Sequence, residues 1–338
     1  MNDQISIIFE KIGFSAINFL VNSKEQKHCV AFGKIGNQDV LIKIFHTSNI
    51  EKSKNLKDEW LACKIIERLN SEGVSNFRAI ESLNFGQEGE YVYLVRKYYQ
   101  GNPFASDANR VNSDFYFDKY SSIDKKFEIP TEDISVGIIS NLLILKKTKG
   151  INPADFDFRQ QGRFPRNYSS EVINDIAKFL GIDLQPVADY LLDSQNLIND
   201  NKNFAVQTND LTPTNIFITK NHEVLFSDFE WMGLENYMID ITFLWMLLWR
   251  YPDWQKIIVD HTVSSDIERD LFRANLVRIV LYNYRDFCLV KKLDDDEERV
   301  SFNKRVFGNH IWTKYLLAAG QSFEAIMEVK QTEENGQN

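Results

Sequence analysis

This sequence lacks any excess of basic residues. Its 338 residues carry 39 Lys and Arg against 48 Asp and Glu, which gives a formal net charge of −9 at pH 7. A chain this acidic does not attract nucleic acid or an anionic membrane surface through its bulk charge. We therefore expect no nucleic-acid partner, and the search for function turns to small molecules.

Cysteine and long apolar runs are scarce as well. The three cysteines, at positions 29, 63 and 288, are far apart, which favours free thiols in a reducing compartment. No Cys or His pair has the spacing of a zinc site. The most apolar segment, 239–249, is interrupted by Asp240 and is shorter than the roughly 20 residues that span a bilayer. With no basic flank before a hydrophobic segment at the N-terminus, these absences predict a cytoplasmic protein without membrane insertion.

The first hundred residues alternate between strand and helix patterns. A Gly-Asn pair at 36–37 separates two β-rich runs and predicts a hairpin. Apolar residues then recur at helical spacing over 62–69, and apolar runs near 79–83 and 91–97 predict two more strands. Residues 1–22 have an amphipathic pattern that predicts a short helix and its exit. This part of the chain therefore predicts a small sheet with one long helix.

Helical spacing dominates the rest of the chain, over 138–147, 171–180, 184–198 and 267–289. A β-rich interlude at 204–229 interrupts these helices. Residues 104–131 fit neither pattern and predict an insertion or a long loop. The acidic run 294–298 predicts a solvated loop, and 331–338 predict a disordered tail.

The β-rich interlude contains polar residues at a defined spacing. Asp210 is followed five residues later by Asn215, and the next hairpin strand ends in Asp228. Phosphoryl transfer from a nucleotide needs a carboxylate that orients and deprotonates the attacking hydroxyl, together with oxygen ligands for Mg²⁺. A tight loop would present Asp210 and Asn215 at one point. The pattern predicts Asp210 as the catalytic base and Asn215 and Asp228 as metal ligands.

This region resembles the catalytic loop of the aminoglycoside phosphotransferases and the choline/ethanolamine kinases, which are small-molecule kinases related to the protein kinases. The resemblance rests on the run 209–215, on Asp228-Phe229-Glu230, and on Asp240 at the start of an apolar helix. It implies ATP and Mg²⁺ as cofactors. It also implies a small-molecule acceptor that offers a hydroxyl group, as an amino alcohol, an aminoglycoside or a sugar-like compound.

The same resemblance implies an α+β, bilobed, protein-kinase-like fold. Residues 1–100 would form the N-lobe, a small β-sheet with one long helix, and residues 101–330 the larger, mostly helical C-lobe. Lys43 corresponds to the strand lysine that contacts the nucleotide phosphates, and Glu59 to the helix glutamate that pairs with that lysine.

The resemblance also implies a hinge at 93–99, where backbone groups around Val95 and Lys97 would contact the adenine. The sequence departs from the family at two points. Thr208 stands where the family has a His, and no Gly-rich loop precedes Cys29, which leaves Ser23 as the candidate phosphate contact. These departures motivate an alternative, a nucleotide-binding pseudokinase that scaffolds a partner. A protein kinase is less favoured, because its Asp-Phe-Gly and Ala-Pro-Glu signatures are missing.

Several of these residues also have ordinary structural interpretations. Lys43 could be an edge-strand lysine. Asp240 is expected to cap the helix that it precedes, and it could also hold the catalytic loop. Glu230 could be a carboxylate at the rim of the active site or a surface residue. The helical spacing of Trp245 and Trp249 predicts core packing rather than a cation–π cage for a quaternary ammonium group.

Overall fold

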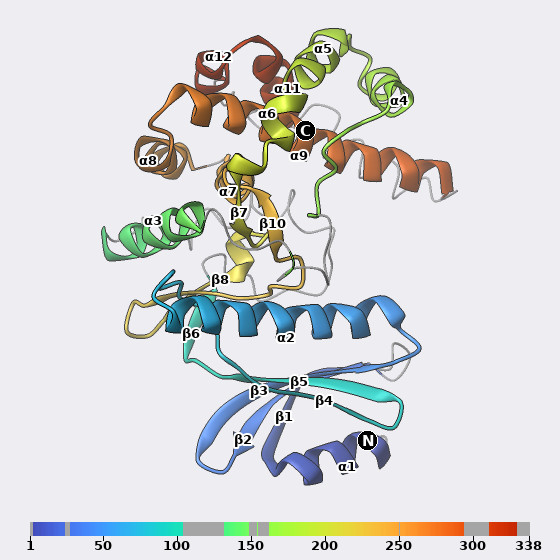
Figure 1. The fold of residues 1–338 in the computed structure, drawn as a ribbon. Helices are drawn as coiled ribbons and strands as arrows, with labels where there is room; N and C mark the ends of the chain where they lie inside the picture. Colours follow the sequence, from blue (N-terminus) through green and yellow to red (C-terminus); the bar gives the residue numbers. More distant parts are fainter. Residues whose placement is uncertain are drawn as a thin grey trace, which may run out of the picture.

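The chain is described in a computed structural model over residues 3–23, 28–103, 132–148, 154, 162–249, 251–293 and 311–329. The predicted insertion at 104–131, the acidic run at 294–298 and the tail at 331–338 lie outside these residues. A β-sheet with helices α1 and α2 forms one part of the molecule, and a larger helical part lies beyond α2 (Figure 1).

The N-terminal sheet contains β1 (Phe14–Ser23), β2 (His28–Ile35), β3 (Gln38–His46), β4 (Ser82–Glu88) and β5 (Tyr91–Lys97). The strand order is β1-β2-β3-β5-β4, and every neighbouring pair is antiparallel. The predicted hairpin is confirmed, because β2 and β3 pair across a turn in which Gly36 has a φ of 58°. This left-handed conformation suits glycine.

The prediction for residues 1–22 is only half right. Helix α1 (Asp3–Ile12) is present, but it ends at Gly13, whose φ is 68°, and β1 follows directly. Register shifts interrupt the pairing of β1 with β2 at two places, so the apolar residues of β1 do not alternate evenly. For this reason the strand gives no clear period of two in the sequence.

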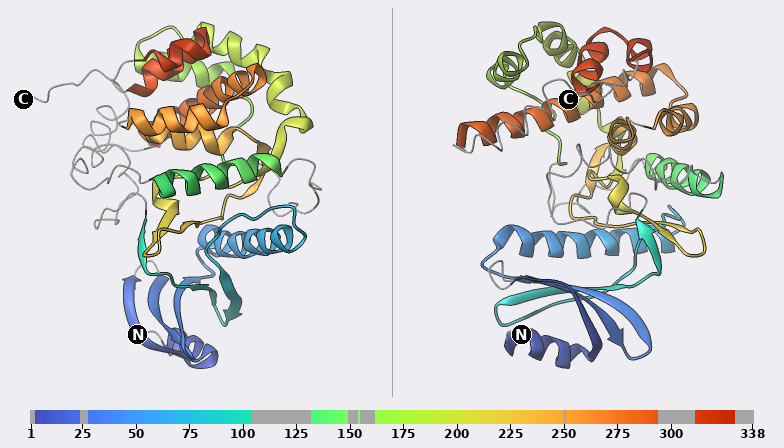
Figure 2. Two further views of the ribbon diagram at one scale, coloured as in Figure 1. Left: turned by 90° about the vertical axis from the view of Figure 1, so that its left-hand side faces the viewer. Right: turned by 180° about the vertical axis from the view of Figure 1, so that it is seen from behind.

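Helix α2 (Ile50–Ser71) is the predicted long helix of this part. Its N-terminus is capped by Asn49, whose side chain accepts a hydrogen bond from the Lys52 N–H at 3.2 Å. The side and rear views show α2 lying between the N-terminal sheet and the rest of the molecule (Figure 2). A residue on the buried face of α2 can therefore meet both parts of the protein.

Two small sheets lie beyond α2. One has the order β6-β8-β9, and the other pairs β10 with β7. The strands are β6 (Gly101–Pro103), β7 (Phe204–Gln207), β8 (Ile216–Thr219), β9 (Val224–Phe226) and β10 (Gly233–Asn236). A Cβ on Gly101 would lie 2.1 Å from the Ile218 carbonyl oxygen, so this close approach requires glycine. The division of the chain near residue 100 stays a prediction, and β6 already pairs with β8.

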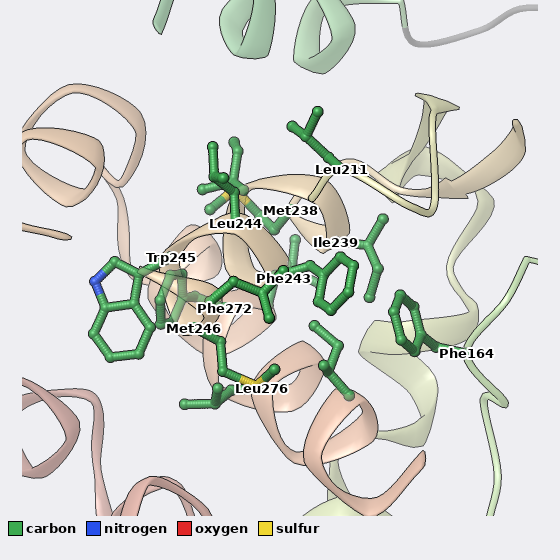
Figure 3. Close-up of a cluster of buried hydrophobic side chains, with 14 of the residues drawn as sticks. Phe164, Leu211, Met238, Ile239, Phe243, Leu244, Trp245, Met246, Phe272 and Leu276 are labelled. Atoms are coloured by element: carbon green, nitrogen blue, oxygen red, sulfur yellow. The ribbon is translucent and has the colours of Figure 1, made fainter. Parts of the chain in front are cut away.

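The remaining helices are α3 (Glu132–Lys147), α4 (Ser170–Leu180), α5 (Gln185–Asp193), α6 (Gln195–Asn199), α7 (Ile239–Leu247), α8 (Pro252–Thr262), α9 (Asp266–Leu293), α11 (Ile311–Gln321) and α12 (Phe323–Met327). All nine residues of α7 are buried, and α7 packs against α9. Figure 3 shows this core, with Phe243 and Trp245 of α7 beside Phe272 of α9. Trp245 thus belongs to the core, as predicted.

Among the described helices, none combines the length and the apolar character that a bilayer span requires. The fully buried α7 is also too short for one. Its importance is local, since it begins next to the loop between β7 and β8, where the predicted catalytic residues lie. The hydrophobic burial of α7 therefore holds in place the helix that contacts this loop.

Candidate active site

Three charged residues predicted from the sequence meet between the N-terminal sheet and β9. The Nζ of Lys43 lies 3.4 Å from Oε2 of Glu59 on α2 and 2.8 Å from Oδ1 of Asp228. Glu59 is 1% exposed, so its carboxylate requires a cationic partner. Lys43 lies on β3, which is an interior strand, and this excludes its interpretation as an edge-strand lysine.

Arg96 is a fourth member of this cluster that the sequence analysis missed. Its guanidinium forms an ion pair with Glu59, and its Nη2 lies 3.6 Å from Oδ1 of Asp228. The register of β3 and β5 places Arg96 opposite Leu41 and Lys43 opposite Leu94, so both cations lie on the same face of the sheet. An arginine directly after the apolar run 91–95 was the signal that could have revealed it.

The cluster shifts the pKa values of its members. Burial alone would raise the pKa of Asp228, but Lys43 and Arg96 outweigh this effect and hold the pKa below its usual range. Burial and the positive charge of Arg96 lower the pKa of Lys43, and Asp228 opposes them. Asp228 therefore carries its negative charge at neutral pH.

The loop between β7 and β8 brings Asp210 and Asn215 together. The Nδ2 of Asn215 donates to the Asp210 carbonyl oxygen at 2.8 Å and lies 3.5 Å from Oδ2 of the Asp210 side chain. Residues Pro213–Asn215 form one turn of 3-10 helix that closes the loop. The Asn215 carbonyl oxygen accepts from the N–H of Ser227, the residue before Asp228, at 2.9 Å. The predicted base and the two predicted metal ligands are thus neighbours.

Asp240 holds the loop between β7 and β8 through hydrogen bonds. Its side-chain oxygens accept hydrogen bonds from the backbone N–H groups of Thr208 at 2.6 Å and Asn209 at 2.9 Å. The predicted helix cap is wrong, because Asp240 is the second residue of α7 and the residue at the N-cap is Met238. The other interpretation of Asp240, as the residue that holds the catalytic loop, agrees with these contacts.

The hydroxyl of Thr208 takes part in the same loop. Its Oγ1 accepts a hydrogen bond from the Asp210 N–H at 3.4 Å, so a Thr in place of the family's His still contributes to loop geometry. Asn209 adopts the left-handed region with a φ of 58°. Its Nδ2 donates to the Trp231 carbonyl oxygen at 3.1 Å, which ties the loop to the segment after Asp228. Asparagine tolerates this backbone conformation better than most residues.

Asp210 lies in a charged environment of its own. Burial raises its pKa to about 7, Arg163 opposes this shift, and the negative charges of Asp228 and Glu230 add to it. Glu230 also acts on the pKa of Lys43. The negative charge of Glu230 therefore acts on both Asp210 and Lys43. This favours a position at the rim of the site over that of an ordinary surface residue.

Arg163 is the second functional candidate that the sequence analysis missed. Its Nη1 forms an ion pair with Oδ1 of Asp210. The two residues are 47 positions apart, and Arg163 lies in a stretch without a regular apolar period. No local pattern in the sequence could have connected them, since the contact depends on how the chain before α4 passes the loop between β7 and β8.

The proposed contacts with adenine and phosphate stay predictions. The side chain of Val95 is buried in the core of the N-terminal sheet. The Lys97 N–H donates to the Glu81 carbonyl oxygen at 2.9 Å, and its Nζ lies 3.5 Å from a carboxylate oxygen of Glu81. Ser23 is the last residue of β1, and residues 24–27 lie outside the described part of the chain.

The donor set at Asp228 and Asn215 fits magnesium. Both side chains offer oxygen, and Mg²⁺ commonly binds one or two protein oxygens together with phosphates and water. Within the described ranges, no three His, Cys, Asp or Glu side chains gather as a closed metal cage. Asp228 and Asn215 could hold Mg²⁺ in company with a nucleotide.

Comparison of the sequence with protein-family models and with curated protein sequences finds no match. Solved structures do match. A spectinomycin phosphotransferase in complex with ADP and spectinomycin has a TM-score of 0.57 at 11% identity, over 96% of this chain and 98% of that chain. A putative aminoglycoside phosphotransferase from Ralstonia eutropha has a TM-score of 0.58 at 10% identity, over 98% and 99%. The choline kinase of Streptococcus pneumoniae has a TM-score of 0.51 at 14% identity, over 94% and 100%.

These matches confirm the fold class predicted from the sequence. The chain has the α+β, bilobed fold that small-molecule phosphotransferases share with the protein kinases. The structural neighbours are aminoglycoside phosphotransferases and a choline kinase, the families that the loop motif resembles. At 10–14% identity these matches show the architecture alone, because one fold can host different chemistries.

Proposed function

We propose that this protein is an ATP- and Mg²⁺-dependent phosphotransferase that acts on a hydroxyl group of a small molecule. The proposal is carried by one observation: Lys43 on β3 contacts Asp228, and the residue before Asp228 bonds to Asn215, which in turn bonds to Asp210. The residues that we propose as phosphate-binding cation, metal ligands and base are thus linked through hydrogen bonds and one ion pair. These are the groups that phosphoryl transfer requires.

The proposed reaction forms a bond between the acceptor oxygen and the γ-phosphorus of ATP. The bond from that phosphorus to the bridging oxygen breaks, and ADP leaves with the electron pair. The proton of the acceptor hydroxyl passes to the Asp210 carboxylate, which also orients the hydroxyl for attack. Magnesium, when bound, would neutralise charge on the phosphates.

The other residues of the chain would prepare these groups. Asp228 and the amide oxygen of Asn215 would hold Mg²⁺, and Lys43 would contact the α- and β-phosphates while Glu59 keeps it in place. The backbone of β5 is paired on both sides as far as Lys97. The N–H of Tyr98 also donates, to the Asp39 carbonyl oxygen at 2.9 Å. We therefore expect the nucleotide base to contact the backbone just beyond Tyr98, and Ser23 to approach the phosphates.

The direct test is a thermal-shift titration with ATP, with and without Mg²⁺. A ligand at about 100 times its Kd should stabilise the protein by about 2.7 kcal/mol. Asp228→Asn should abolish the Mg²⁺-dependent part of the shift. Asp39→Asn is the matched control, since Asp39 forms an exposed ion pair with Lys34. A wild-type protein that binds no nucleotide would contradict the proposal.

Asp210→Asn tests the base separately. Loss of a positioned base costs about 10²–10⁴ in rate. We expect kcat to fall by that factor while the nucleotide Kd changes less than about threefold, because the proposed base would contact the acceptor and not the nucleotide. A kcat within a few-fold of wild type would show that Asp210 is not the base.

A nucleotide-binding pseudokinase is the second candidate. It is favoured by the ion pair between Arg163 and Asp210, which occupies one oxygen of the proposed base. A protein of this kind would bind ATP without transferring phosphate. Slow hydrolysis of ATP by the wild type in the absence of any acceptor, lost in Asp228→Asn, would argue for the phosphotransferase.

A further inference from the structure

The segment 162–166 packs directly against the loop between β7 and β8. A Cβ on Gly162 would lie 3.0 Å from Oδ1 of Asn209, which is the residue before the proposed base, and 2.9 Å from Oε2 of Glu235. Contacts this close would force the neighbouring atoms to move. Glycine therefore allows the segment to approach the loop, and any movement of the segment reaches the proposed base.

Arg278 of α9 holds the backbone of this segment. Its side chain is fully buried, its Nε donates to the Pro165 carbonyl oxygen at 3.1 Å, and its Nη2 donates to the Phe164 carbonyl oxygen at 2.8 Å. Nη2 also lies 3.1 Å from Oε2 of Glu235, which balances the buried charge. Carbonyl groups in an irregular stretch need such partners. One arginine thus determines the path of the chain after Arg163.

The side chain of Phe164 anchors the same segment in the core. Phe164 is 2% exposed, and its ring centroid lies 5.2 Å from that of Phe243 on α7 and 5.3 Å from that of Tyr282 on α9. Both contacts are edge to face, a favourable arrangement of aromatic rings. Figure 3 shows Phe164 beside Phe243 in this cluster. The neighbouring Arg163 therefore starts from a fixed point of the backbone.

Arg163 is the residue through which this segment meets the proposed base. Its Nη1 forms an ion pair with Oδ1 of Asp210. The other carboxylate oxygen, Oδ2, lies 3.5 Å from Nδ2 of Asn215. The planar guanidinium presents its donors in a fixed geometry, so it restricts the rotation of a carboxylate more than a lysine would. Oδ1 is thus the oxygen that the protein holds most firmly.

We propose that Arg163 and Arg278 are positioning residues for the base. Arg163 holds Oδ1 of Asp210, so that Oδ2 receives the proton of the acceptor hydroxyl, and Arg278 holds the segment that carries Arg163. This inference rests on the phosphotransferase function proposed above and adds the groups that orient its base. Orientation matters because a misplacement of about 1 Å can cost about 100-fold in rate.

Arg163→Ala with chemical rescue tests the first step. Turnover is measured as ADP release from ATP and Mg²⁺, with water alone and with choline, kanamycin and ribose, which are an amino alcohol, an aminoglycoside and a sugar. For each acceptor that the wild type uses, kcat should fall about 10- to 100-fold. The Kd for ADP should stay that of the wild type, because Arg163 acts on the base.

The rescue itself distinguishes a lost guanidinium from a damaged fold. The side chain of Arg163 is 26% exposed, so guanidinium ion at a low millimolar concentration should reach the space that the side chain leaves and restore part of kcat in Arg163→Ala. Urea, which has a similar shape and no charge, should restore none. A kcat in Arg163→Ala that equals or exceeds that of the wild type would show that the ion pair only blocks the base, and would contradict the inference.

Arg278→Lys tests the second step. Lysine keeps the positive charge beside Glu235 but loses the planar donors to the two carbonyl oxygens, so kcat should fall about 10-fold while the KM for ATP is unchanged. Arg273→Lys is the matched control. Arg273 also lies on α9 and donates to backbone carbonyl oxygens, those of Ala319 at 3.0 Å and Gln321 at 3.2 Å. Its variant should lose stability and keep the wild-type kcat.

The double variant shows whether Arg278 acts through Arg163. Arg163→Ala with Arg278→Lys should have the kcat of Arg163→Ala alone, because the segment then has no side chain left to position. A kcat lowered by the product of the two single effects would contradict this part of the inference. If Arg278→Lys does not fold, Gly162→Ala replaces it, since the added Cβ should displace the segment from Asn209 and lower kcat in the same way.

The two proposals fail in different ways. Wild-type protein that binds no nucleotide, or that binds ATP and releases no ADP with water or any of the three acceptors, contradicts the phosphotransferase function and the positioning roles with it. Turnover by the wild type, combined with unchanged kcat in Arg163→Ala, contradicts the positioning roles alone. The ADP affinity of each variant shows that its fold is intact.

Discussion

The Nζ of Lys43 lies 2.8 Å from Oδ1 of Asp228, although 185 positions separate the two residues in the chain. This contact joins β3 of the N-terminal sheet to the segment that follows β9. Lys43→Met should weaken the binding of ADP about 10- to 100-fold, because it removes a charged donor from the proposed phosphate site. Calorimetry in the presence of Mg²⁺ measures this change.

Lys34→Met is the control for that experiment. Lys34 is also a lysine of the N-terminal sheet, but it is half exposed and pairs with Asp39 at 3.2 Å. Its removal should leave ADP affinity unchanged. If both variants bind ADP as tightly as the wild type, Lys43 is a structural partner of Asp228 and does not contact the phosphates.

Arg96 should contribute to stability through Glu59. Both side chains are buried, and removing one member of a buried ion pair typically costs about 3–5 kcal/mol, because the other charge stays buried without its partner. We expect Arg96→Met and Glu59→Gln each to lower the free energy of unfolding by an amount of this order. The double variant should lose clearly less than the sum. Urea unfolding of all four proteins measures the coupling, and strict additivity would show that the pair is not coupled.

The sequence allowed prediction of features that depend on local pattern. The hairpin around Gly36 and the run from Asp210 to Asn215 lie within short segments, where spacing alone determines which residues meet. Lys43 and Glu59 were paired through the resemblance to known kinases, and they are in contact. What was predicted correctly was thus either local or carried by a family pattern.

The features that were missed depend on tertiary contacts or on irregular backbone. The bulges of β1 hide its alternation, and the partners of Arg96 lie on α2 and after β9. Arg163 meets Asp210 because the chain folds back toward the catalytic loop. Asp240 looks like a helix cap in sequence, yet its oxygens accept from the backbone of another segment. A charged residue gives no sign in the sequence of which distant charge it will meet.

Asp240 offers a test of how the catalytic loop is held. Asp240→Ala removes the acceptors of two backbone N–H groups that are buried, which should cost about 1–3 kcal/mol for each group. The proposed base would lose its fixed position, so kcat should fall while the ADP Kd changes little. Asp240→Asn keeps one acceptor oxygen and should give an intermediate loss. An alanine variant with normal kcat would mean that the loop keeps its shape without this support.

The buried pair of Glu235 and Arg278 should make stability depend on pH. Burial alone would raise the pKa of Glu235, but Arg278 and Arg166 outweigh it and hold the pKa below the ordinary value of 4.5. A lowered pKa means that the folded state favours the charged carboxylate. The stabilisation from this group is therefore present above pH 4.5 and is lost as the pH falls through the lower folded-state pKa.

Glu235→Gln separates this effect from general acid unfolding. At neutral pH the variant should be less stable by about 3–5 kcal/mol, since Arg278 stays buried and charged. The difference from wild type should narrow as the pH falls below 4.5, because protonation removes the same charge from the wild-type protein. Urea unfolding across this range measures both curves.

Glu324→Gln, at a largely exposed glutamate 3.9 Å from Arg269, should cost less than about 1 kcal/mol at every pH. Parallel curves for Glu235→Gln and wild type would mean that Glu235 titrates alike in the folded and unfolded chain.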